Sequence, residues 1–220
     1  MNYNQQYRKN FELDEVSSEK CKNALEHALD IRKFEIGLYW QRATYFWTLI
    51  AATFAGYFAV LSAEHMVDKE FNAFILACFG LVFSLAWFLT NRGSKFWQEN
   101  WENHVDMLED SITGPLYKTI LYRPRPSSIG TRILEWAVEG PKPFSVSQLN
   151  QWVSLFTLLA WFGLIYSVLP EFSSRKDVSW RHVGMIILTG MAWLLMLTRS
   201  QSSIGKEHKY AIAVRPTSII

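Results

Sequence analysis

Four long apolar blocks without a charged residue constrain this chain more than any other feature. They cover residues 43–61, 71–90, 152–170 and 183–198. A bilayer core about 30 Å thick requires roughly 20 apolar residues in a helix, and an isolated strand would cross it with its backbone polar groups unpaired. Four such stretches are difficult to bury in a soluble core of 220 residues. We therefore predict an all-α, polytopic membrane protein with four transmembrane helices.

The fourth block is the shortest of the four. Arg181 and His182 precede it and Arg199 follows it. Long basic side chains at the ends of a short span can reach the lipid headgroups, which makes this length workable. The N-terminus, from Met1 to about Glu35, is polar and contains no apolar region of the kind found in a signal peptide, so the first span is expected to act as the insertion signal.

The distribution of Lys and Arg predicts the topology. Eighteen of the 22 basic residues lie in residues 1–42, 91–151 and 199–220, whereas the connections 62–70 and 171–182 hold the other four. Basic residues accumulate on the cytoplasmic side of a membrane protein. We therefore expect a bacterial cytoplasmic (inner) membrane protein with both termini in the cytoplasm and the two connections outside.

The cytoplasmic parts are predicted to be helical. In the leader, residues 1–42, a helix capped by Ser17 or Ser18 should continue without a break into the first span. After the second span, Ser94 is expected to cap a separate helix that runs to about Ile112.

Gly and Pro residues are expected to interrupt the helices in the rest of the segment 91–151. Gly114-Pro115 should end the helix that Ser94 begins, and a short helix is predicted over residues 131–138. We interpret the whole segment as a helical cytoplasmic domain.

Two sets of residues are candidates for contacts. Small side chains let membrane helices approach closely, and the apolar stripe of an amphipathic helix must be covered by the chain itself or by another subunit. The oligomer or packing candidates are Trp97, Trp101, Leu108, Ala52, Gly56 and Gly80. The candidates for the membrane interface, where aromatic and basic residues gather, are Trp40, Arg42, Trp47 and Arg199. Arg42 is interpreted as an interface anchor, with a lipid-headgroup or subunit contact as the alternative.

Nothing in the sequence amounts to a catalytic or metal-binding signature. The densest cluster of possible ligands is Glu102, His104, Asp106, Glu109 and Asp110. We interpret it as a solvated acidic face, because His104 falls on the same helix face as the tryptophans and one metal could not reach all five side chains. No P-loop, nucleophile elbow, paired CxxC or HExxH occurs. We expect neither enzyme activity nor a cofactor, and two unpaired cysteines, Cys21 and Cys78.

A resemblance to known proteins rests on three runs. They are Trp40 to Trp47 at the entry to the first span, Gly93 to Asp110, and Gly114 to Thr119. These runs resemble the RipA family of small octameric proteins of the bacterial cytoplasmic membrane. The resemblance implies a homo-oligomer with a cytoplasmic domain and leaves the biochemical role open. A looser similarity links the layout to the small transmembrane effectors of bacterial nucleotide-sensing defence systems, although no obvious sensor domain is present.

The sequence is compatible with three functions. We favour a non-enzymatic homo-oligomer that acts as a scaffold or sensor in envelope or stress physiology or host adaptation, with itself and membrane lipids as partners. The alternative is an ion channel or pore-forming effector gated by its cytoplasmic domain, for which the polar candidates are Thr48, Thr53, Asn72 and Ser84. The third is a membrane enzyme that uses the acidic cluster. A net charge of only +2 without a basic face argues against nucleic acid as a partner.

Overall fold

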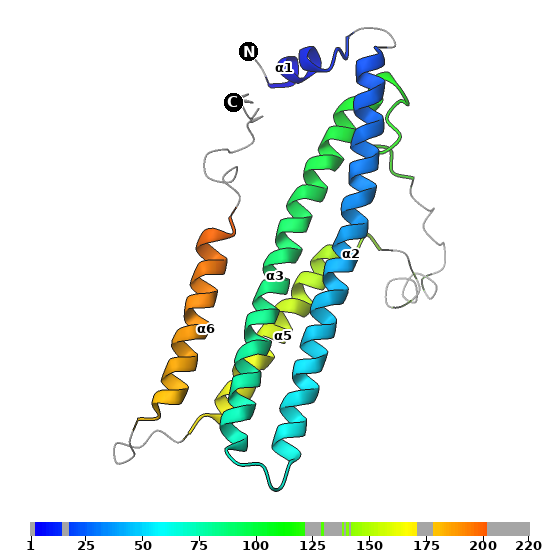
Figure 1. Ribbon diagram of the computed structural model, residues 1–220. Helices are drawn as coiled ribbons and strands as arrows, with labels where there is room; N and C mark the ends of the chain where they lie inside the picture. Colours follow the sequence, from blue (N-terminus) through cyan, green and yellow to red (C-terminus); the bar gives the residue numbers. More distant parts are fainter. Residues whose placement is uncertain are drawn as a thin grey trace, which may run out of the picture.

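The regular structure of this chain is helical throughout the part that can be described. The computed structural model describes residues 3–14, 18–121, 142–170 and 178–201, with the isolated positions 129, 138 and 140. Its elements are α1 Tyr3–Asn10, α2 Glu19–Ser62, α3 Lys69–Leu108, the 3-10 turn η1 Glu109–Ser111, α5 Val146–Val168 and α6 Trp180–Arg199 (Figure 1). The predicted all-α class is confirmed. The helix predicted over residues 131–138 falls outside the described ranges.

The helix α2 forms as the sequence predicts. The Ser18 hydroxyl accepts the backbone N–H of Cys21 at 3.3 Å, which satisfies one of the donors that every helix N-terminus leaves free. From there a single helix of 44 residues runs to Ser62. Gly37 does not interrupt it, so the polar leader and the first span form one rigid rod.

The helix α3 corrects one prediction. A separate helix beginning at Ser94 was expected, but α3 is continuous from Lys69 to Leu108. Ser94 lies inside the helix, where its hydroxyl accepts a hydrogen bond from Arg42 at 3.1 Å instead of capping a new N-terminus. The chain does turn at Gly114, as predicted, with a φ of +71° that favours glycine. The helix ends at Leu108, earlier than the predicted Ile112, because the 3-10 turn η1 follows it.

The helix α3 is the centre of the fold. It packs along α2 as an antiparallel hairpin, and it also contacts α5 and α6 (Figure 1). Large side chains from three helices form the main core, among them Tyr57, Phe74 and Trp161, each no more than 1% exposed. By contrast, α6 contributes no fully buried residue. All four long helices are long and apolar enough to cross a membrane, and the predicted spans lie largely within them.

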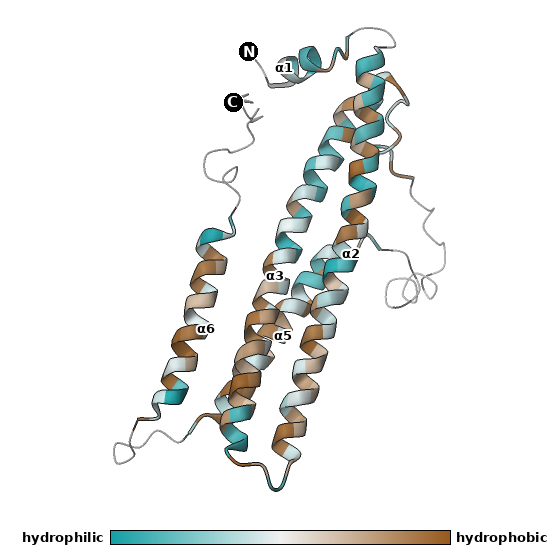
Figure 2. Cartoon of the chain, in the orientation of Figure 1, coloured by the Kyte–Doolittle hydropathy of each residue, from teal (hydrophilic) through white to brown (hydrophobic). Residues whose placement is uncertain are grey.

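One end of the molecule projects beyond α5 and α6. We call it the arm: residues 3–14, which include α1, residues 19–42 of α2, and residues 91–118, which include the end of α3 and the turn after it. It is more hydrophilic than the rest of the hairpin (Figure 2). The arm nevertheless has a core of its own, formed by Tyr7, Leu13, Cys21, Leu25, Ala28, Val105 and Leu108. It is therefore a folded module that shares two helices with the membrane part.

Candidate functional site

A cluster of buried polar side chains joins three helices at the base of the arm. The Asn150 amide donates to the Tyr39 hydroxyl at 2.7 Å, which links α5 to α2. The Asn91 amide of α3 lies 3.4 Å from both the Asn150 carbonyl and the Ser154 hydroxyl of α5. All four residues are less than 9% exposed. We call this cluster the polar junction.

The polar junction fixes how the helices meet. A polar group buried without a partner costs about 1–3 kcal/mol, so the arrangement that satisfies these groups is favoured over shifted ones. Because each helix supplies a partner to another, sliding any one of them would break hydrogen bonds on its neighbours. The position of α5 against the α2–α3 hairpin is therefore set by named contacts at Tyr39, Asn91 and Asn150.

Arg42 lies beside the polar junction. Its Nη1 donates to the Ser94 hydroxyl at 3.1 Å and lies 3.7 Å from the Glu35 carboxylate. The side chain is 38% exposed, so the ion pair contributes little to stability. These contacts lie within the chain, joining α2 to α3. The sequence analysis did not foresee them, since it considered only lipid and subunit partners for Arg42.

Sequence reasoning also missed the polar junction itself. Asn91 immediately follows the second apolar block and Asn150 lies just before the third. Polar residues in such places look like ordinary ends of a span. The available signal was that an amide at the end of each of two neighbouring spans, with Tyr39 before the first, could meet at one level of the bundle.

In the arm, His104 belongs to an aromatic group. A hydrogen bond of 2.8 Å joins the Tyr7 hydroxyl and His104 Nδ1, and the rings of Trp101 and His104 lie 5.3 Å apart. Burial raises the pKa of Tyr7 and lowers the pKa of His104. His104 therefore lies on the same side of α3 as Trp101, as the sequence analysis predicted, and its neutral form is favoured.

Glu109 corrects the prediction of a solvated acidic face. This residue is fully buried, and its carboxylate accepts the backbone N–H of Tyr117 at 2.7 Å and of Lys118 at 3.2 Å. The cause is the early end of α3: the chain reverses at Gly114 and brings two free backbone donors onto the carboxylate. Glu109 thus holds the turn that follows η1.

The other acidic residues of the cluster behave more as expected. Asp110 is exposed and pairs with Lys118 at 2.7 Å, and Glu102 lies 3.4 Å from Arg32. Asp106 is part-buried. Within the described residues, no group of three His, Cys, Asp or Glu side chains is placed to hold a metal ion. The two cysteines, Cys21 and Cys78, are free and buried.

The predicted packing candidates separate into two groups. Leu108 belongs to the core of the arm, and Trp101 packs against that core. Gly80 lies against the ring of Trp161, which a Cβ at this position would overlap. A Cβ at Gly56 would meet Leu76 at 3.5 Å. These four residues are engaged within the chain, whereas Ala52 is exposed and Trp97 is only part-buried.

Three of the four interface candidates are exposed. Trp40 and Trp47 are 43% and 44% exposed, and Trp47 lies edge-on to Trp87. Arg199 is exposed at the end of α6. This placement suits residues at a membrane boundary.

At the opposite end of the bundle, a charged pair ties α6 to the loop between α2 and α3. Arg181 donates to Asp68 at 2.8 Å and lies over the ring of Phe71 at 4.5 Å. The hydrogen bond and the charge of Arg181 lower the pKa of Asp68. This pair anchors the start of the least buried helix.

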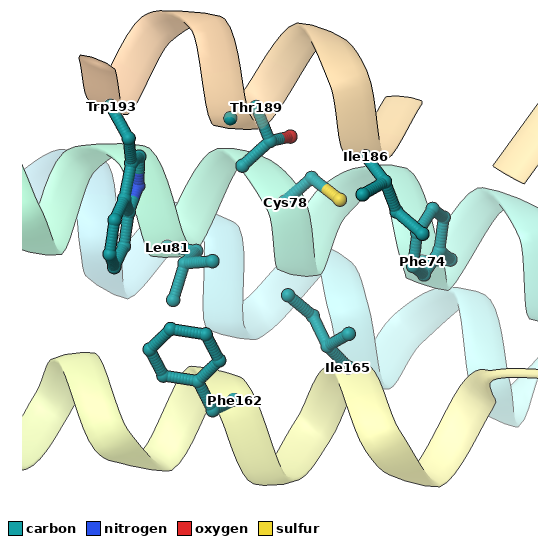
Figure 3. A pocket seen from close by; sticks show the side chains of 9 residues that line it. Phe74, Cys78, Leu81, Phe162, Ile165, Ile186, Thr189 and Trp193 are labelled. Carbon is teal, nitrogen blue, oxygen red and sulfur yellow. The ribbon is translucent and has the colours of Figure 1, made fainter. Parts of the chain in front are cut away.

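A cavity of about 240 Å³ lies between α3, α5 and α6. Apolar side chains dominate its lining, including Phe74 of α3, Phe162 of α5 and Ile186 of α6 (Figure 3). Three lining residues, Cys78, Thr189 and Trp193, carry a polar group, but the surface that the residues present to the cavity is apolar. Such a cavity suits hydrocarbon and offers no acid–base pair for catalysis.

Four apolar helices of spanning length, tied by a polar junction and extended by a folded arm, define a polytopic α-helical membrane protein. The chain belongs to the octameric membrane protein family (8xMP), whose model matches residues 22–170. The match begins in α2 and ends after α5, so it includes most of the arm and the polar junction. No curated protein and no solved structure matches the chain. Membership makes this a homo-oligomeric membrane protein and confirms the resemblance to octameric membrane proteins.

Proposed function

We propose that this protein is a non-enzymatic scaffold or sensor of the bacterial inner membrane, assembled from eight copies that each hold an arm in the cytoplasm. The continuity of the helices carries the proposal. Both α2 and α3 run from the membrane part into the arm without a break, and the arm has its own core. An octamer would thus display eight rigid modules at fixed spacing, which is what a scaffold requires.

The cytoplasmic position of the arm is supported by charge. Residues 1–42 and 91–151 hold fourteen of the 22 basic residues, whereas the connection 62–70 at the far end of the hairpin holds only Lys69. The positive-inside rule then favours the arm as the cytoplasmic end. Both chain termini would lie on this side, and anionic headgroups would be the nearest lipid partner.

A sensor role is supported by how the arm is connected. The polar junction ties the start of α5 to Tyr39 and Asn91, which belong to the two helices that enter the arm. A partner that tilts the arm would therefore displace α5 as well. Envelope or stress physiology and host adaptation are the settings we propose for such coupling.

The absence of an enzyme activity is supported by the polar groups of the arm. The Glu109 carboxylate holds two backbone N–H groups, and His104 is hydrogen-bonded to Tyr7 within an aromatic group. Groups engaged in this way stabilise the fold and are poorly placed to meet a substrate. We propose no cofactor and no nucleic-acid partner.

The channel alternative finds less support. Thr53 is 7% exposed and its hydroxyl donates to the Leu49 carbonyl, and Ser84 is fully buried. The Asn72 amide donates to the Val67 carbonyl near the loop. Of the polar pore-lining candidates, Thr48 is the exposed one, and its hydroxyl donates to the carbonyl of Thr44.

Reconstitution separates the two functions. The full chain is placed in liposomes loaded with a potassium-sensitive or proton-sensitive dye, with empty liposomes and an added ionophore as the two references. The scaffold account predicts vesicles as tight as empty ones across a range of protein-to-lipid ratios. Ion flux that rises with the number of assemblies per vesicle would contradict it and favour the channel.

A further inference from the structure

One face of α2 points away from the rest of the chain over most of its length. Its exposed residues recur at helical spacing, and we call them the outer stripe: Phe34, Gly37, Gln41, Tyr45, Thr48, Ala52 and Ala55. The opposite face of the same helix is buried, at Tyr39, Ala43, Ile50 and Tyr57. The stripe begins in the arm and continues into the first apolar block without a change of direction.

Inside the membrane part, the outer stripe differs from most of the outward face of α5. Past Tyr45, which is 66% exposed at the start of the first apolar block, it presents small side chains and a hydroxyl, at Thr48, Ala52 and Ala55. The outward face of α5 presents large ones instead, such as Phe156 and Leu159, which are 72% and 58% exposed. Small residues let one membrane helix approach another closely, whereas a face in contact with lipid does not require them. This contrast favours a helix as the neighbour of α2.

In the arm, the same stripe carries an exposed aromatic side chain and, next to it on this face, a glycine. Phe34 is 64% exposed, although it lies outside the apolar blocks. A Cβ at Gly37 would meet nothing within 4 Å, so packing within the chain does not require a glycine there. Glycine in a helix interior costs about 1 kcal/mol relative to alanine. A neighbour that covers Phe34 would account for its exposure, and the open space over Gly37 leaves room for that neighbour.

We infer that the outer stripe of α2 is the surface through which one copy of this chain packs against the next. This inference rests on the octamer of the proposed function. A second copy is the occupant because the chain belongs to an octameric family, and each subunit must cover part of its surface with its neighbours. Within the first apolar block, from Thr48 to Ala55, the stripe contains no charged residue, so a neighbouring helix can dock there without burying a charge. In the arm, Asp30 and Lys33 line the same groove as Phe34, Gly37 and Gln41, so a neighbour would meet charged groups at that end.

Photo-crosslinking in intact membranes tests the assignment. A benzophenone amino acid is placed at Ala52 in one variant and at Leu159 in the other, which is exposed on α5. Illumination should yield covalent dimers from position 52, and the control at position 159 should yield lipid adducts and monomers. The method reads contact directly, so it does not depend on whether a substitution disrupts folding. Dimers from position 159 with none from position 52 would overturn the inference.

A disruption experiment complements the crosslink. Ala52→Trp adds a bulky side chain to the outer stripe, and Leu159→Trp is the matched change on α5. Native mass spectrometry should show smaller assemblies for the first variant and the wild-type assembly for the second, at equal helix content. A wild-type octamer that gives no dimers at position 52 would refute the stripe and leave the octamer standing. A wild-type monomer would refute the octamer itself.

Discussion

Replacing Gly80 with alanine is expected to loosen the packing of α3 against α5. The new Cβ would overlap the Cε2, Cζ2 and Cδ2 atoms of the Trp161 indole. This ring cannot simply swing aside, because it is fully buried and stacks on Phe54 with centroids 4.1 Å apart. It also lies edge-on to Tyr57 at 6.1 Å. The clash must therefore be relieved by separating two helices.

The magnitude follows from two opposing effects. Forcing an extra methyl group into a well-packed core typically costs about 1–3 kcal/mol. The overlap with a rigid, buried ring places Gly80→Ala at about 3 kcal/mol. Alanine in place of glycine in a helix stabilises by about 1 kcal/mol. The net expectation is a loss of about 2 kcal/mol, or roughly a 30-fold fall in the folding equilibrium constant.

Reversible unfolding in mixed micelles, by titration with sodium dodecyl sulfate, measures this loss. Gly163 of α5 supplies the control, since a Cβ there would meet nothing within 4 Å, and Gly163→Ala should be neutral or slightly stabilising. Combining Gly80→Ala with Trp161→Phe should cost less than the sum of the two single changes, because the smaller ring makes room. Equal stability of the wild type and Gly80→Ala would refute the packing described here.

Three further predictions concern the polar contacts. Tyr39→Phe leaves the Asn150 amide without its acceptor at 2.7 Å and should lower the free energy of unfolding by about 1–3 kcal/mol in the sodium dodecyl sulfate titration. An unchanged unfolding midpoint would argue against the polar junction. Glu109→Gln replaces one acceptor oxygen with an NH2 group, which should weaken one of the two hydrogen bonds by about 1.4 kcal/mol. Hydrogen exchange of the backbone amide at Tyr117 or Lys118 should then become about tenfold faster. Unaltered exchange rates would contradict the buried contact. Burial lowers the pKa of His104 in the folded state, so the stability of the arm should fall as the pH drops below the ordinary histidine pKa of 6.5. His104→Gln should flatten this pH dependence. The same fall in stability in both proteins would show that another group is responsible.

The overall fold could be predicted because its determinants are local. An uncharged run of about 20 apolar residues has few alternatives to a membrane helix. The cap at Ser18 and the uninterrupted leader identified α2 as one rod. The prediction at Ser94 was wrong for a physical reason. A serine after a glycine is typical of a helix cap, but here the Ser94 hydroxyl accepts a hydrogen bond from Arg42, 52 positions away in the chain. The continuity of α3 therefore depends on tertiary contacts that spacing alone does not reveal.

The candidate site was harder to predict, because its residues act at long range. Tyr39 and Asn150 are separated by 111 positions, and their hydrogen bond exists only once α2, α3 and α5 have packed. Glu109 looked like one more member of an acidic face, since its burial results from a turn several residues later. In contrast, the aromatic side of the same helix was identified correctly through His104 and Trp101, because a 3.6-residue period determines which residues share a face.

Native mass spectrometry of the full chain, released from nanodiscs or mild detergent, tests the central claim most directly. Eight chains of 25.6 kDa give an assembly of about 205 kDa, which is the mass that membership of the octameric family predicts. The account predicts this species at protein concentrations well below those in the membrane, without added partners. A stable monomer of 25.6 kDa under the same conditions would contradict the homo-octameric scaffold.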